Sequence, residues 1–174
     1  MSDKTSSQAE LDKQLLDKLT DSPFRSVGAM KAPDSKGDIT TWGKEIYEGL
    51  VPIRATLYPH PAATYTLHLD EKYGNLLGNL HGGAAATIFD IATTMTLALV
   101  QSEGFWQHWG VSRTLSCTYL RPAQVNRHVT IHCEVVSFGK RLVHIKGSMK
   151  DRDGKVLVTC EHDKVNTDTR STKL

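Results

Sequence analysis

Apolar and polar residues alternate in several short segments of this chain, which is the pattern of strands with one buried face. The clearest segment is HVTIHCEVVSF, residues 128–138, where every second position from Val129 to Val135 is apolar. The pattern predicts strands over residues 51–59, 62–70, 111–123, 128–138, 141–149 and 155–165. Two connections have turn composition: Pro-His-Pro at 59–61, and Asp-Arg-Asp-Gly at 151–154, whose Asp-Gly pair favours a tight hairpin.

One longer apolar segment, from about residue 83 to residue 100, does not alternate. It contains threonines, which lower helix propensity, but it is longer than an ordinary strand and predicts one buried helix. The order is then two strands, one helix and four further strands, which we expect to form a meander. This order predicts an α+β domain with an antiparallel sheet and a helix against one face.

The region before the first strand has a different pattern. Residues 1–9 are polar and are predicted to be disordered. Leucines at positions 11, 15, 16 and 19 recur at helical spacing and predict a short amphipathic helix, and residues 31–38 have the composition of a linker. We therefore expect an N-terminal extension over residues 1–45, one domain over 46–167 and a polar tail over 168–174.

Charge excludes some classes of partner. The chain has 21 basic and 19 acidic residues, a formal net charge of +2 spread along the sequence, which gives no basis for binding nucleic acid. The apolar run is short for a bilayer and carries an acid, so membrane insertion is not expected. The three cysteines are odd in number and widely spaced, as in a reduced intracellular protein.

Asp90 is the one residue between positions 79 and 100 that carries a formal charge at pH 7, with histidine counted as neutral. Burying an isolated carboxylate is unfavourable unless the group is paired or hydrogen-bonded, so its presence requires a reason. One interpretation is a structural hydrogen bond to a nearby hydroxyl or backbone group. The other is a general base or nucleophile whose basicity is raised by apolar surroundings.

The residues around Asp90 resemble a known family. His81-Gly82-Gly83 before an apolar helix, the acid nine residues after His81, and the strands that follow are similar to hotdog-fold acyl-CoA thioesterases of the phenylacetate-degradation and thioesterase superfamily member 2 type. The resemblance covers roughly residues 48–166 and includes NLLGNLHGG, FD, GVS and TYLRPA in the family's order.

The resemblance implies a fold and an activity. The fold is an antiparallel sheet of about six strands wrapped around one long buried helix. The activity is hydrolysis of acyl-CoA to free acid and coenzyme A, with no cofactor, since coenzyme A is part of the substrate. It also implies a homodimer with the active site between subunits, assembling as a dimer of dimers.

Several family positions carry over by residue. Asn75 matches the asparagine that helps to position substrate and water, and Gly82 matches the residue whose backbone N–H holds the thioester oxygen. Asp90 matches the catalytic acid and Ser112 the serine that assists it. His81 matches the motif histidine, which we interpret as mainly structural.

The predicted coenzyme A contacts fall in two segments, near the end of one strand and in a later turn. A basic turn is also a common solvated feature, so that interpretation of the second segment stays open. The residues are Tyr119, Arg121, Ser137, Gly139, Lys140 and Arg141.

The Gly82 position also has a physical basis. Unpaired N–H groups and the positive end of the helix dipole suit a carbonyl oxygen that becomes negative as water adds. The alternative is that His-Gly-Gly is only a turn into a helix. Gly83 and Asp90 are seven helical residues apart, about 10 Å along the axis, so we expect Gly82 and Asp90 to meet from two subunits.

The chain departs from the family in residues 101–110, QSEGFWQHWG, which form a longer loop than usual. Its aromatic residues Phe105, Trp106 and Trp109 are expected to line an acyl pocket or to pack at a subunit interface. The sequence does not choose between the two.

Other functions have weaker support. His128 and His132 are four residues apart in a strand, about 13 Å, so they do not predict a metal site. Ser112 is not in a G-x-S-x-G motif, which argues against a serine hydrolase. A hotdog hydratase or dehydratase and a non-catalytic acyl-thioester binding protein remain as alternatives.

The expected location is the cytoplasm. The chain ends in Thr-Lys-Leu, which differs by one residue from the peroxisomal signal Ser-Lys-Leu, so the peroxisome is an alternative. A mitochondrial location is also left open.

Overall fold

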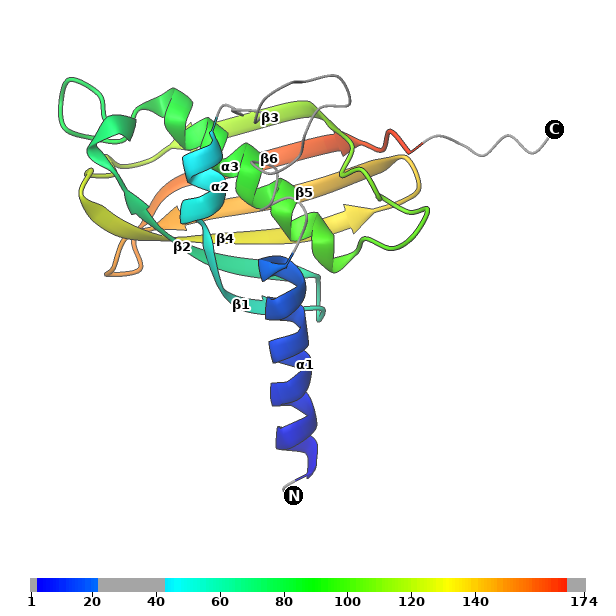
Figure 1. Cartoon of the computed structure of the whole chain (residues 1–174). Helices are drawn as coiled ribbons and strands as arrows, with labels where there is room; N and C mark the ends of the chain where they lie inside the picture. Colours follow the sequence, from blue (N-terminus) through cyan, green and yellow to red (C-terminus); the bar gives the residue numbers. More distant parts are fainter. Residues whose placement is uncertain (1–2, 22–42, 169–174) are drawn as a thin grey trace, which may run out of the picture.

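The computed structural model describes residues 3–21 and 43–168, with side chains from residue 7 onward. In chain order the elements are α1 (Asp3–Thr20), α2 (Lys44–Gly49), β1 (Val51–Thr56), β2 (Ala62–Leu69), the 3-10 turn η2 (Glu71–Tyr73), α3 (Gly82–Thr96), its 3-10 extension η3 (Leu97–Leu99), β3 (Val111–Tyr119), β4 (Arg127–Phe138), β5 (Leu142–Lys150) and β6 (Val156–Val165). The six strands form one antiparallel sheet, and α3 lies across one face (Figure 1). The predicted α+β fold is confirmed.

The strand order is β1-β2-β4-β5-β6-β3, so the expected four-strand meander is wrong. β4 pairs with β2, and β3 pairs with the last strand, β6. Alternation determines which face a side chain takes, but it carries no information about the neighbouring strand. The chain leaves β2, crosses the sheet as α3 and returns as β3 at the opposite edge from β1 (Figure 1).

Helix α3 forms the centre of the core. Its sheet-facing side chains, among them Ile88, Phe89 and Met95, are buried. Gly147 on β5 permits this close approach, because a Cβ there would lie 2.8 Å from the Phe89 ring. Residues 82–99 are long and apolar enough to cross a bilayer, but 67% of that segment is buried inside the domain, which agrees with the predicted core helix.

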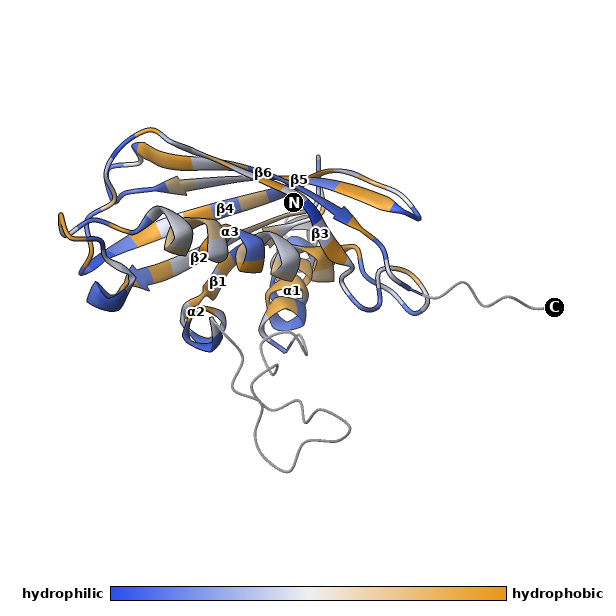
Figure 2. Ribbon diagram, turned by 90° about the horizontal axis from the view of Figure 1, so that it is seen from above, coloured by the Kyte–Doolittle hydropathy of each residue, from blue (hydrophilic) through white to orange (hydrophobic). Residues whose placement is uncertain are grey.

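The remaining two helices lie on the same side of the sheet as α3 (Figure 2). α1 buries Leu15 and Leu19 in the core that contains the sheet, and Lys18 Nζ donates to the carbonyl of Gln101. Because α1 begins at Asp3, the predicted disorder is wrong for residues 3–9. Residues before the buried leucines include good helix formers and extend the helix.

The expected linker at 31–38 and the C-terminal Thr-Lys-Leu lie outside the described residues. The division of the chain at residues 45 and 167 stays a prediction. α2 begins at Lys44, one residue before the first of these positions.

The 101–110 loop packs on its own chain. Trp106 is completely buried with Leu97, Val135, Val143 and Ile145 in a second apolar cluster, and its Nε1 donates to the Gly139 carbonyl at 2.8 Å. The expectation that the loop lines an acyl pocket or a subunit interface is therefore wrong for Trp106. A side chain that is enclosed within one protomer cannot serve either purpose.

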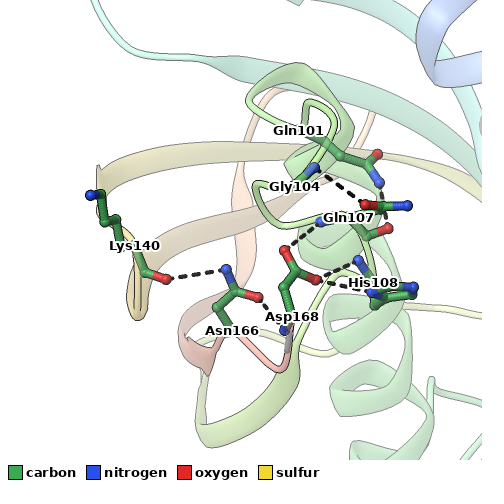
Figure 3. A network of polar contacts seen from close by, with 7 residues as sticks. All are labelled: Gln101, Gly104, Gln107, His108, Lys140, Asn166 and Asp168. Carbon is green, nitrogen blue, oxygen red and sulfur yellow. Dashed lines mark hydrogen bonds and ion pairs between the residues drawn. The ribbon is translucent and has the colours of Figure 1, made fainter. Parts of the chain in front are cut away.

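The side-chain carboxylate of Asp168, shortly after β6, holds this loop in place (Figure 3). Asp168 accepts hydrogen bonds from the backbone N–H groups of Gln107 at 2.8 Å and His108 at 3.0 Å. These bonds lower the pKa of the Asp168 carboxyl, although burial acts in the opposite direction. The segment after β6 is thereby joined to the loop that precedes β3.

Candidate active site

The first turn of α3 is capped by a histidine. His81 Nδ1 accepts the N–H of Gly83 at 3.0 Å, and a Cβ on Gly83 would lie 3.2 Å from that nitrogen. The glycine therefore leaves room for the cap. Among the described residues the N–H of Gly82 has no acceptor, and it lies at the positive end of the helix. His81 thus makes the contact that a turn-holding role requires.

Tyr119, at the end of β3, holds the same turn. Its hydroxyl donates to the carbonyl of Gly82 at 2.8 Å. A Cβ on Gly82 would lie 3.4 Å from the Tyr119 ring and hydroxyl, so the two residues are in close contact. The sequence predicted Tyr119 as a coenzyme A contact; the structure adds this bond to the helix N-terminus.

Asn75 organises the loop before α3. Its side-chain carbonyl accepts the N–H groups of Leu77 at 2.9 Å and Asn79 at 3.2 Å. This leaves the Nδ2 group as the donor that remains for a ligand. Asn75 is exposed, and so are Leu76 and Leu77 beside it.

Asp90 is neither isolated nor fully buried. Its side chain is 44% exposed, and its Oδ1 accepts a hydrogen bond of 2.8 Å from the Ser112 hydroxyl. The expectation of a lone acid in apolar surroundings is therefore wrong. Asp90 lies on the flank of α3 that faces β3 at the edge of the sheet, where polar groups and solvent reach it.

A buried histidine lies behind this pair. His162 on β6 is completely buried, with Nε2 3.0 Å from Ser112 Oγ and 3.4 Å from Asp90 Oδ1. Burial, assisted by the charge of Lys164, lowers the pKa of His162 to about 4, while the charge of Asp90 acts in the opposite direction. The imidazole is therefore neutral at pH 7.

The contacts of the other ring nitrogen, Nδ1, determine the tautomer of His162. Thr93 Oγ1 lies 2.6 Å from His162 Nδ1 and donates its own proton to the Phe89 carbonyl, so it accepts from Nδ1–H. His162 Nε2 is then an acceptor. The Ser112 hydroxyl has one proton and two acceptors in reach, His162 Nε2 and Asp90 Oδ1.

A buried lysine also approaches the site from β6. Lys164 is 3% exposed and donates to Thr94 Oγ1 at 3.0 Å; Thr94 in turn donates to the backbone carbonyl of Asp90 at 2.6 Å. Burial lowers the pKa of Lys164, and the negative charge of Asp90 raises it. Tyr47 on α2 also lies near Asp90. Burial raises the pKa of Tyr47, and the negative charge of Asp90 raises it further.

This site occurs within a segment of known family. Residues 77–158, which include Gly82, Asp90 and Ser112, match the thioesterase superfamily. The chain carries a thioesterase-superfamily domain. The predicted resemblance is therefore confirmed at the level of the superfamily.

Relatives support the same assignment. The mouse protein acyl-coenzyme A thioesterase 13 is 29% identical over 99 residues, which is 56% of this chain and 68% of the relative. The fold is similar to zebrafish thioesterase superfamily member 2, with a TM-score of 0.64 and 22% identity over 84% of this chain and 95% of the other. A Streptococcus pneumoniae thioesterase protein with coenzyme A has a TM-score of 0.55 and 22% identity over 63% of this chain and 84% of the other. These similarities confirm the hotdog fold and the class of thioester hydrolases.

Within the thioesterase domain, the predicted catalytic residues form two groups. Asn75, His81 and Gly82 lie at the N-terminal end of α3, whereas Ser112 and Asp90 are bonded to each other farther along. The roles assigned to these residues stay predictions.

The predicted coenzyme A contacts of the thioesterase domain lie at opposite ends of the sheet (Figure 1). Arg121 follows β3 and donates from Nη1 to the Val156 carbonyl at 2.7 Å. Lys140 and Arg141 are exposed in the β4–β5 turn, with Ser137 and Gly139 beside them. One chain therefore does not bring the two groups together.

His162 and Lys164 were not predicted from the sequence as site residues. A signal was present in the alternation of β6, where Val158, Cys160, His162 and Lys164 take the inward positions. Two polar residues in an inward series are a marker of a site.

Among the described residues, no group of three His, Cys, Asp or Glu side chains is placed to hold a metal ion.

Proposed function

We propose that the protein hydrolyses acyl-CoA thioesters to a free acid and coenzyme A. The observation that carries this proposal is the half-exposed Asp90 carboxylate held by Ser112, in a superfamily domain whose relatives include acyl-coenzyme A thioesterase 13. The half-exposed carboxylate is open to a water molecule or a substrate. The Streptococcus pneumoniae protein with coenzyme A supports the choice of acyl carrier.

In the proposed reaction, Asp90 acts as a general base or as a nucleophile. As a base, it takes a proton from water while the water oxygen adds to the thioester carbon. The Gly82 N–H and the Asn75 Nδ2 group donate to the carbonyl oxygen as it becomes negative. The C–S bond then breaks, and the thiolate of coenzyme A takes up the proton. As a nucleophile, an Asp90 oxygen adds to the thioester carbon, the C–S bond breaks and coenzyme A leaves as a thiolate that takes a proton from solvent; water then hydrolyses the mixed anhydride to the free acid and the Asp90 carboxylate.

Ser112 and His162 position Asp90 in this scheme. Ser112 donates its hydroxyl proton to the carboxylate, and the neutral His162 presents Nε2 from the buried side as a second acceptor for that proton. The Ser112 hydroxyl proton has two acceptors, Asp90 Oδ1 and His162 Nε2. When Asp90 takes up a proton, the Ser112 hydroxyl can therefore turn to His162, and the carboxyl group does not need to move.

The two groups of catalytic residues are proposed to meet across a two-fold axis. Tyr119 holds Gly82 and Ser112 holds Asp90, and these two β3 residues are seven positions apart, about 23 Å along the strand. β3 is an edge strand, with Val111 and Tyr119 more than half exposed. If β3 pairs antiparallel with its copy, Tyr119 of one chain lies opposite the first residues of β3 in the other. Gly82 then approaches the second chain's Asp90.

The same arrangement supports the proposed coenzyme A contacts. It places the Tyr119 and Arg121 end of one chain beside the other chain's end of the sheet, which carries Lys140 and Arg141. Basic groups there suit the phosphates of coenzyme A. We also propose the family's dimer of dimers, for which the resemblance is the support.

The test is a panel of short, long and aromatic acyl-CoAs, with the free thiol detected as it forms. We expect turnover with at least one class. Binding of acyl-CoA without thiol release would instead support the non-catalytic alternative. A single turnover in isotopically labelled water tests the nucleophilic role. Label in the Asp90 side chain, which requires water to add to the Asp90 carbon of a mixed anhydride, would establish that Asp90 is the nucleophile.

A further inference from the structure

We propose that Cys117 and Cys160 form a peroxide-reactive dithiol that closes to a reversible disulfide between β3 and β6. The two cysteines are 43 positions apart in the sequence, yet they are directly opposite in the antiparallel pairing of these strands. This proposal does not depend on the hydrolysis of thioesters. It concerns two thiols for which the proposed reaction has no use.

The geometry suits a bridge. Directly opposite residues of an antiparallel pair have Cα atoms about 4.5–5.5 Å apart and side chains on the same face. Disulfides require Cα atoms about 4.4–6.8 Å apart, so no backbone movement is needed. The two thiols are also within hydrogen-bonding contact of each other, and both are free.

The two thiols have different roles. Cys117 is half-buried on the edge strand, and its contact with Cys160 lowers its pKa, which favours the reactive thiolate. Cys160 is 3% exposed, and its contact with Cys117 together with burial raises its pKa. Cys117 is therefore the thiol that meets the oxidant, and Cys160 is the thiol that resolves the product.

The chemistry balances with hydrogen peroxide as the oxidant. The Cys117 thiolate attacks one peroxide oxygen, the O–O bond breaks, and the products are a sulfenic acid and hydroxide. The Cys160 sulfur then attacks the Cys117 sulfur, the S–O bond breaks, and the hydroxyl group leaves with the Cys160 proton as water. One peroxide is reduced to two waters and two thiols are oxidised to one disulfide.

The third cysteine is a control within the same chain. Cys133 is completely buried, and burial raises its pKa to about 12. Its position on β4 is separated from Cys160 by β5, where Gly147 pairs with both residues. Cys133 is expected to stay a thiol under the same treatment.

The experiment uses the full chain, reduced and then freed of reductant. Hydrogen peroxide is added, remaining thiols are alkylated under denaturing conditions, and the protein is digested without reduction for mass spectrometry. We expect a mass loss of two hydrogen atoms and a peptide pair that joins Cys117 to Cys160, both reversed by dithiothreitol. Cys133→Ser should keep the bridge. Cys160→Ser should lose the bridge and accumulate sulfenic acid on Cys117, trapped by dimedone.

Three results would overturn the proposal. They are intact thiols at both positions, a sulfenic or sulfinic acid on Cys117 of the unsubstituted chain without a bridge, and a bridge that joins two chains or involves Cys133. Circular dichroism before oxidation checks the fold of each variant. Mapping of the unsubstituted chain decides the matter even where a variant fails to fold.

Discussion

The hydroxyl oxygen of Ser112 lies 2.8 Å from Oδ1 of Asp90, and this hydrogen bond joins the edge strand β3 to the middle of α3. Behind it, His162 Nε2 lies within 3.4 Å of the same carboxylate oxygen. A helix, an edge strand and its neighbouring strand therefore converge on one acid. The first predictions concern that acid.

Substitution of Asp90→Asn is expected to reduce kcat by about 10²–10⁴-fold, the usual contribution of a positioned acid or base. The amide has nearly the same volume, so the fold should persist. Thiol release from acyl-CoA and circular dichroism measure the two effects. A folded Asp90→Asn protein with unchanged kcat would show that Asp90 has only the structural role.

Ser112→Ala removes the hydroxyl but leaves the carboxylate, so we expect a smaller loss, about 10–100-fold in kcat. If Ser112 acts through Asp90, the double variant should be no slower than Asp90→Asn alone. The kinetic measurement is a double-mutant cycle on one acyl-CoA. Losses that multiply would mean that the two residues act separately.

Mixing two inactive proteins tests whether the site is shared. Asp90→Asn and Asn75→Ala carry defects in different halves of the proposed site, so a mixed dimer contains one intact site. We expect partial recovery of activity after the subunits exchange. Exchange shown by native mass spectrometry without any recovery would exclude a shared site.

The lowered pKa of His162 predicts that the folded protein loses stability in weak acid. Between pH about 6.5 and about 4, the unfolded chain binds a proton on this residue that the folded chain does not bind. The free energy of unfolding therefore falls as pH falls through this window, by at most about 3 kcal/mol, and the loss is complete below it. Urea denaturation at several pH values measures the effect.

His162→Gln should weaken that dependence without abolishing it, because burial also lowers the pKa of His132, which loses stability in the same direction. The lowered pKa of Asp168 does not interfere, because stability from a depressed carboxyl pKa is lost only as pH falls below about 3.8. An equal slope in both proteins between pH 6.5 and 4 would refute the assignment to His162.

Trp106→Ala is expected to lower the free energy of unfolding by about 3–5 kcal/mol, since a completely buried indole leaves a large cavity. Phe138→Ala is the matched control, because Phe138 is 46% exposed and should cost about 1 kcal/mol or less. Similar losses in the two variants would contradict the enclosed position of Trp106.

Several features of the fold and the site could be predicted from the sequence. Alternation from Val129 to Val135 identified β4, and the Asp-Gly pair at 153–154 identified the β5–β6 hairpin. The His81-Gly82-Gly83 motif located the start of α3, where His81 caps the helix. These features are local: the period of a strand and the φ of a turn depend on residues that are near in sequence.

The partners of Asp90 were not accessible in the same way. His162 is 72 positions after Asp90, and its alternation with Cys160 indicated an inward side chain without indicating what it would meet. The exposure of Asp90 was also misjudged, since an apolar neighbourhood in sequence does not report which flank of a helix faces the edge of a sheet.

The sequence by itself determined the strands, the core helix, the glycine-containing turn at its start and the acid in its middle, because periodicity and backbone restrictions act over a few residues. Only the tertiary structure decided that β3 lies beside β6, because the pairing of β3 depends on the edge of the sheet that the chain has reached when it leaves α3. That single pairing brings Ser112 and His162 to Asp90, and Cys117 to Cys160.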